Sequence, residues 1–125
     1  MNRAELRNLI EKLAEAWRTR DYAAAANTFT EDVRYADPLR YSFQSREDLR
    51  AFFEDDGGHP QRVVFRTILF DEEQQTAAAE YTYEGTHRYH GVVLLHVRDG
   101  KISHWREYQH IDPREWEDFA SGTAF

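Results

Sequence analysis

The chain has 125 residues, of which 41% are hydrophobic, 31% charged and 14% aromatic, and its formal net charge is −7. This length suits one compact domain and is too short for two domains of ordinary size. The acidic balance argues against nucleic acid or an anionic membrane as a partner, and the absence of cysteine excludes disulfides, thiolate nucleophiles and cysteine-ligated zinc.

The first half of the chain carries the signals of helices. Apolar residues recur at helical spacing on one face of residues 6–17, and charged residues take the other face. Asp21 can cap a short helix of four alanines. A short strand is expected at Val33–Asp37. Ser45, with Asp48 three residues later, resembles a capping box and predicts a further helix.

The second half is rich in strand-forming residues. The pattern predicts strands at Arg62–Phe70, Thr76–His90, Val92–Arg98 and Ile102–Ile111. The long strand Thr76–His90 is expected to bend or bulge near Gly85. The Asp99-Gly100 pair is a strong turn signal and predicts a hairpin between the last two strands.

Helices followed by strands indicate an α+β fold, in which the N-terminal helices pack on the concave face of a curved antiparallel sheet. Such a sheet, covered by helices, leaves a cone-shaped hollow. Residues 112–115 are expected to cap a last short helix that holds Trp116 and Phe119. Neither a linker nor an internal repeat divides the sequence, so residues 1–125 are expected to form a single domain.

The ends and apolar runs of the sequence bear on its location. The N-terminal residues lead directly into an amphipathic helix, and no signal peptide is visible. The apolar run Val92–Leu95 is far shorter than a membrane span. A cytoplasmic location without a membrane partner is therefore expected.

Two stretches carry a family resemblance: Trp17 through Asp37-Pro38, and Asp99–Tyr108, which reads DGKISHWREY. The chain resembles the nuclear transport factor 2-like superfamily, and within it the SnoaL-like and ketosteroid isomerase-like proteins. The resemblance covers nearly the whole chain. It implies a cone-shaped α+β barrel with a small-molecule pocket, and a homodimer through the outer face of the sheet. Members include isomerases, cyclases, epoxide hydrolases, dehydratases and non-catalytic binders, so the fold alone sets no reaction.

The resemblance also places candidate catalytic residues. Asp37 falls on the proton-shuttling aspartate of ketosteroid isomerases, but the two oxyanion donors of those enzymes fall on Leu13 and near Leu94. Losing one such donor typically costs about 100- to 1000-fold in rate, so steroid isomerisation by that arrangement is not expected. Glu107 matches one acid of the epoxide hydrolase constellation, whose arginine and second acid have no counterpart here.

Strand periodicity groups the candidate residues by face. Trp105 and Glu107 share one face of the last strand, and Tyr35 and Asp37 share a face by the same period of two. The resemblance of Glu107 to a pocket acid puts this face inward. The predicted pocket consists of Trp17, Tyr35, Asp37, Tyr81, Tyr83, Trp105 and Glu107, with His87 and His96 as further candidates.

Two interpretations of the pocket stay open. In the first, it binds a small, largely apolar organic molecule for isomerisation, cyclisation or hydration: Asp37 takes the proton with a raised pKa, Glu107 polarises a water or substrate oxygen, and Tyr81 and Tyr83 orient the substrate. In the second, the protein is a non-catalytic ligand-binding or dimerisation module. Its cavity is then filled by side chains, or its acid pairs with an arginine.

No cofactor is expected. His87 and His90 are three residues apart on a predicted strand, so they point to opposite faces and cannot chelate one metal together. A metal site is therefore not expected, although a facial triad from different strands is the alternative. No glycine-rich phosphate loop and no nucleophile elbow is present.

Overall fold

The computed structural model describes residues 1–115 and 117–118. The elements of this part are α1 (Arg3–Arg18), α2 (Tyr22–Asn27), β1 (Phe29–Asp37), β2 (Tyr41–Phe43), α3 (Arg46–Glu54), β3 (Arg62–Asp71), β4 (Thr76–Glu84), β5 (Arg88–Arg98) and β6 (Lys101–Ile111). Trp116 and Phe119, expected in a final helix, lie outside the described residues.

Each helix begins at a capping side chain. The Asn2 side chain accepts the Glu5 backbone N–H at 2.9 Å, and the Glu5 carboxylate accepts the Asn2 N–H at 2.7 Å. Asp21 and Ser45 cap α2 and α3 by accepting a backbone N–H three residues further on. The helix starts predicted at Asp21 and Ser45 are confirmed, because these side chains satisfy donors that a helix leaves free at its first turn.

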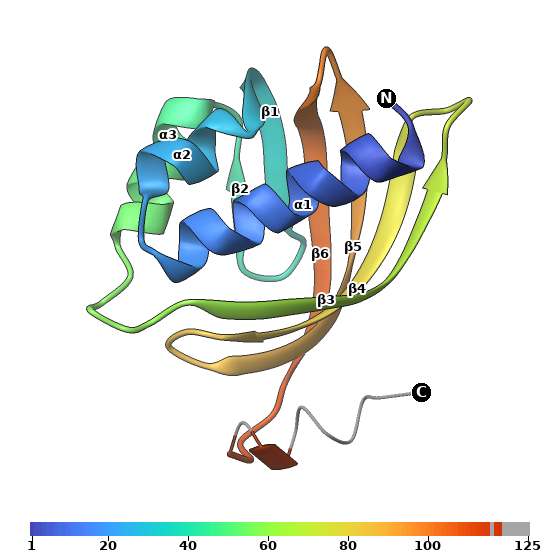
Figure 1. The fold of residues 1–125 in the computed structure, drawn as a ribbon. Coiled ribbons are helices and arrows are strands. Elements are labelled where there is room, and N and C mark those ends of the chain that lie inside the picture. The colour runs from blue at the N-terminus through green and yellow to red at the C-terminus, as the bar shows by residue number, and fades with distance from the viewer. Residues whose placement is uncertain (116, 119–125) are drawn as a thin grey trace.

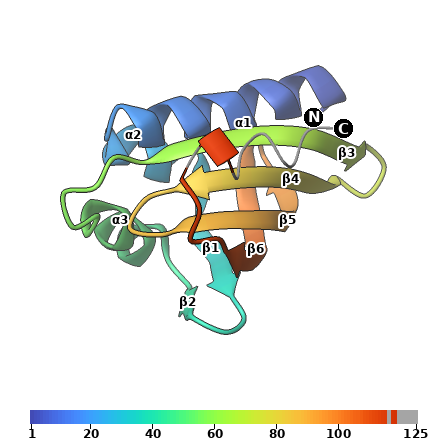
Figure 2. The same cartoon turned by 90° about the horizontal axis from the view of Figure 1, so that it is seen from below.

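The six strands form one curved, unclosed sheet in the order β2-β1-β6-β5-β4-β3, and the helices lie on its concave side (Figures 1 and 2). The predicted α+β class is confirmed. The expectation of a purely antiparallel sheet needs one correction, because β1 runs parallel to β6 with Tyr35 opposite Trp105. The other pairs are antiparallel. The strand that pairs with β1 is β6, which follows α3 and the antiparallel strands β3, β4 and β5 in the chain. A long connection of this kind allows β6 to run in the same direction as β1.

The long strand predicted at Thr76–His90 is wrong, because the chain reverses within it. It forms the hairpin β4–β5, whose turn the Gly85 N–H closes on the His87 carbonyl at 2.9 Å. A Cβ at Gly85 would lie 2.5 Å from the Tyr83 hydroxyl, so glycine leaves room for that ring. The reversal places Tyr83 opposite Tyr89, and both tyrosines face the concave side.

The space under the helices is divided into a packed end and a hollow end. The inward-facing residues of β4 are Ala77, Ala79, Tyr81 and Tyr83. The two alanines are buried in the core with Leu6, Ile10 and Leu13 of α1. Beyond them the two tyrosines line a cavity. In the described part of the chain, no helix is long and apolar enough to span a membrane.

Candidate functional site

A cavity of about 240 Å³ lies between the concave face of the sheet and the helices. Its lining is mostly aromatic and comprises Trp17, Tyr22, Tyr35, Tyr41, Phe52, Phe53, Asp55, Asp56, Gln61, Val63, Phe65, Tyr81, Tyr83, Thr86, His87, Tyr89, Trp105, Glu107 and Gln109. Trp105 and Glu107 are buried, whereas Asp55, Thr86 and His87 are exposed. The cavity therefore runs from a buried floor on β6 to a mouth between the α3–β3 loop and the β4–β5 turn.

The floor of the cavity is a set of rings in mutual contact. Tyr35 stacks on Trp105 with ring centroids 5.8 Å apart and an interplanar angle of 6°, as the β1–β6 register dictates. Trp17 meets Trp105 edge-on at 6.0 Å. Tyr35 also stacks on Tyr41 of β2 at 6.1 Å. Such offset and edge-on pairs hold the wall in one arrangement.

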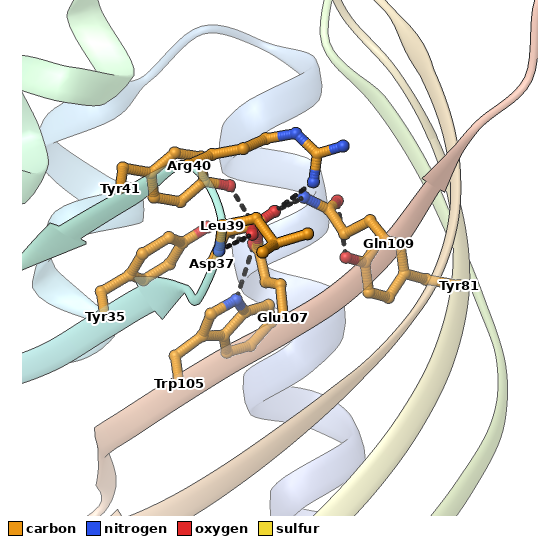
Figure 3. A network of polar contacts seen from close by, with 9 residues as sticks. All are labelled: Tyr35, Asp37, Leu39, Arg40, Tyr41, Tyr81, Trp105, Glu107 and Gln109. Carbon is orange, nitrogen blue, oxygen red and sulfur yellow. Dashed lines mark hydrogen bonds and ion pairs between the residues drawn. The ribbon is translucent and has the colours of Figure 1, made fainter.

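Glu107 projects from β6 into this ring cluster and is only 6% exposed (Figure 3). Its Oε1 atom accepts the Tyr35 hydroxyl at 2.6 Å and the Trp105 indole N–H at 2.8 Å. Its Oε2 atom accepts the Tyr41 hydroxyl. Burial raises the pKa of Glu107 above its usual value, and the three hydrogen bonds counter that rise only in part. Glu107 is thus a desolvated acid on the cavity wall.

Asp37 ends β1 and is 3% exposed, but it does not line the cavity. Its Oδ1 atom accepts the Leu39 N–H at 2.9 Å, and its Oδ2 atom accepts Arg40 at 2.7 Å and Gln109 at 3.0 Å. Burial alone would raise the pKa of Asp37, but the donors from Gln109, Leu39 and Arg40 outweigh burial and lower it. The raised pKa expected for Asp37 is therefore wrong.

Gln109 links Asp37 to Tyr81, which lines the same cavity as Glu107. It donates to Asp37 and accepts the Tyr81 hydroxyl at 2.7 Å. Tyr81 can reach Gln109 because Gly91 lies beneath its ring: a Cβ there would be 2.6 Å from the Tyr81 hydroxyl and 3.0 Å from the Tyr108 backbone oxygen. The Tyr81–Gln109–Asp37 chain thus fixes the wall beside Glu107.

The structure brings most of the predicted pocket residues together. Those on the cavity wall are Trp17, Tyr35, Tyr81, Tyr83, His87, Trp105 and Glu107. Asp37 and His96 are the exceptions. Asp37 is buried behind the lining, as described above. His96 points outward, because Val93, Leu95 and Val97 point inward along β5, and it is exposed and contacts Thr76 and His104. Among residues 1–115 and 117–118, no group of three or more acidic or histidine side chains could hold a metal ion.

Three residues outside the predicted pocket take part in the site: Tyr41, Arg40 and Gln109. Tyr41 and Arg40 belong to the β1–β2 turn and edge strand, where nothing in the local pattern indicates a contact with β6. For Gln109 a signal existed, because the period of two puts it on the same face as Glu107.

Asp37 yields a pH-dependent prediction. A carboxylate whose pKa is lower in the folded than in the unfolded protein, where it is about 3.9, stabilises the fold above that pH and loses this contribution as pH falls through the folded pKa. We expect the stability difference between the wild type and Asp37→Asn to be largest above about pH 4 and to shrink toward pH 2. Urea unfolding at a series of pH values measures it, and a difference that stays constant from pH 6 to pH 2 would contradict it.

The architecture is that of an α+β cone: a curved open sheet with helices on its concave side and an aromatic cavity between them. The sequence model of the SnoaL-like domain matches residues 10–105. The chain therefore belongs to the SnoaL-like domain family, within the nuclear transport factor 2-like superfamily. A comparison with curated proteins found no significant match.

Several solved structures are similar to this chain. The Δ5-3-ketosteroid isomerase of Mycobacterium sp. is 16% identical, with a TM-score of 0.74 over 86% of this chain and 98% of that one. An LEH-like epoxide hydrolase of M. tuberculosis is 16% identical, with a TM-score of 0.73 over 86% of this chain and 84% of that one. A ketosteroid isomerase-like protein from Catenulispora acidiphila, in complex with trimethylamine, is 19% identical, with a TM-score of 0.70 over 80% and 83%. At these identities the likeness shows a shared fold.

Proposed function

We propose that the protein binds a small, largely apolar organic molecule in the aromatic cavity, and that Glu107 exchanges a proton with it. The observation that carries this proposal is the buried carboxylate of Glu107 on the cavity wall, with a raised pKa. The cavity of about 240 Å³ lies below the roughly 300–1,000 Å³ of drug-sized sites, which favours a small ligand. The trimethylamine complex of the Catenulispora protein supports a ligand of modest size.

Glu107 would serve as the general base. A carboxylate offers about four acceptor positions, and Tyr35, Trp105 and Tyr41 take three of them. The fourth, on Oε2, is left for the ligand. A raised pKa makes the carboxylate a better proton acceptor, so Glu107 would take a proton from a carbon or oxygen of the substrate and return it at a second position.

Asp37 would have a positioning role in this scheme. Its lowered pKa makes it a weak base, and its oxygens are held by Arg40, Leu39 and Gln109. The proton-accepting role expected of Asp37 therefore passes to Glu107. Asp37 would orient Gln109, and Tyr81 and Tyr83 would orient the substrate.

A non-catalytic binding module is the second candidate function. The observation that favours it is the Asp37–Arg40 ion pair. An acid that is paired with an arginine is expected in a non-catalytic module, because the pair keeps the carboxylate from accepting a proton. The two candidates agree on ligand binding and differ on turnover.

A screen of the wild-type protein separates the two functions. Enones, epoxides and polyketide-like compounds are tested for a rise in melting temperature and for chemical conversion. The enzyme hypothesis predicts that at least one class both stabilises the protein and is converted, and that conversion depends on Glu107. Binding without conversion across the panel would favour the module. The absence of binding by this panel and by the two compounds of the next subsection would reject both candidates.

We also propose that the outer face of the sheet forms a homodimer. Apolar side chains there are partly exposed, including Val64 at 41%, Val92 at 40%, Leu94 at 36% and Tyr108 at 49%. Glu80 lies among them with its buried Oε1 atom lacking a hydrogen-bond partner in the described part of the chain. A contiguous apolar surface rimmed by polar groups is typical of a subunit interface.

Measuring the oligomeric state tests whether the outer face of the sheet is a dimer interface. Light scattering during size-exclusion chromatography is expected to give a dimer for the wild type at micromolar concentration. Tyr108→Glu should shift the protein to a monomer, since it places a charge in the proposed interface. Leu39→Glu is the control, because Leu39 is 88% exposed on the β1–β2 turn. A wild type that stays monomeric at tens of micromolar would reject the interface.

A further inference from the structure

In the described residues, the carboxylates on the cavity lining have no lysine or arginine among them. In the part of the chain that the structure describes, three carboxylates line the cavity and no lysine or arginine does so. Glu107 lies at the floor, and Asp55 and Asp56 lie toward the mouth. The guanidinium of Arg40 is 2.7 Å from Asp37 and lies over the Tyr89 ring at 5.4 Å, but Arg40 is not a lining residue. The lining therefore presents no fixed cation to an anionic ligand.

The hydrogen-bond donors at the floor are already engaged. The hydroxyls of Tyr35 and Tyr41 and the indole N–H of Trp105 point at Glu107 (Figure 3). The Tyr81 hydroxyl donates to Gln109, whose amide in turn donates to Asp37. A ligand carbonyl would find no uncommitted donor among these groups. What the floor offers is an acceptor, on Oε2 of Glu107, so a ligand group that contacts Glu107 has to supply the N–H or O–H.

The remaining walls are aromatic faces and edges. A cation placed within about 6 Å of a ring centroid is attracted by the ring quadrupole, and the attraction grows when water is excluded. Phe65 contacts Tyr81 and Trp105 with centroids 5.8 and 6.3 Å apart, and Trp17, which also lines the cavity, contacts Trp105 at 6.0 Å. These rings can surround alkyl groups attached to a charged nitrogen.

We propose that the ligand of this cavity is a small protonated amine. Its N–H donates to Oε2 of Glu107, and its carbon substituents lie against the rings. This inference rests on the proposed function, because it takes the same cavity as the ligand site. At the mouth Asp56 pairs with Arg20 at 3.4 Å, which leaves Asp55 as the second carboxylate there. Asp55 and the net charge of −7 also favour entry of a cation.

Two compounds of matched shape, one charged and one neutral, test whether the positive charge of the ligand contributes to binding. N,N-dimethylbenzylamine is protonated near neutral pH, and isobutylbenzene is its neutral isostere. Titration calorimetry or ligand-observed NMR on the wild type is expected to show about 10-fold tighter binding, or more, for the amine. Equal or tighter binding of the isostere would overturn the amine proposal while leaving the cavity as a ligand site.

Substitutions test whether the preference for the amine arises at Glu107 and the rings of this cavity. Glu107→Gln should weaken amine binding about 10-fold and leave isostere binding unchanged. Glu73→Gln, on the exposed β3–β4 turn, makes the same charge change and should alter neither. Phe65→Leu removes a ring while retaining apolar volume, so it should weaken the amine more than the isostere even if the Glu107 variant folds poorly. Amine binding that survives both Glu107→Gln and Phe65→Leu would reject the site. Failure of both compounds and of the whole panel above would reject the proposed function itself.

Discussion

Replacing Glu107 by glutamine is expected to lower turnover of any substrate found for this protein by about 100- to 10,000-fold, the usual contribution of a general acid or base. The amide has nearly the shape of the carboxylate but cannot accept a proton from the substrate. The fold is expected to persist, because glutamine fills the same volume and the Tyr41 hydroxyl can turn to accept its N–H group. Steady-state kinetics on purified, folded variant measures the effect.

The control for this experiment is Glu73→Gln, which makes the same charge change away from the cavity and should leave turnover within experimental error. Circular dichroism and thermal melting establish that the Glu107 variant is folded. Full turnover by a folded Glu107→Gln protein would end the assignment of Glu107 as the base.

Truncating Trp105 to alanine is expected to destabilise the fold by about 3–5 kcal/mol. Trp105 is 2% exposed, and its ring contacts Trp17, Phe29 and Tyr35. Its removal leaves a void that these rings can fill only in part. Because natural domains are stable by about 5–15 kcal/mol, the variant would lose a large share of its stability. Urea unfolding followed by circular dichroism measures the change.

Two further substitutions give this prediction its contrast. Trp105→Phe keeps a ring in the stack but removes the indole donor to Glu107, so it should cost less stability than alanine and raise the pKa of Glu107 further. Leu39→Ala, at an 88% exposed position, should change stability by less than about 0.5 kcal/mol. If Trp105→Ala cost no more than Leu39→Ala, the ring cluster would not be the core of the site.

Local patterns sufficed for part of this site. The capping residues Asp21 and Ser45 predicted helix starts that the structure confirms. The period of two placed Trp105 and Glu107 on one face of β6, and both line the cavity. Along β5 the same period shows which residues share a face, but it does not show which face is buried. His96 was therefore expected in the pocket, whereas it lies on the exposed face.

The contacts that define the chemistry come from distant parts of the chain. Tyr41 reaches Glu107 across 66 residues, and Gln109 reaches Asp37 across 72. Both contacts depend on the parallel pairing of β1 with β6. The sequence predicted an antiparallel sheet, so this pairing was not expected. The β4–β5 reversal at Gly85 was missed for a related reason, since its glycine is required by the Tyr83 ring and not by a familiar turn pair.

The amino-acid sequence by itself determined where helices begin, which residues alternate along the strands, the wealth of rings and the family resemblance, since these depend on neighbours in the chain. Only the tertiary structure shows how the surroundings of the two candidate acids differ. Asp37 ends β1 and Glu107 lies within β6, but the pKa of each depends on the donors and the burial that other elements bring to it. Arg40 and Gln109 hold Asp37 as an anion, whereas the ring cluster desolvates Glu107 on the cavity wall.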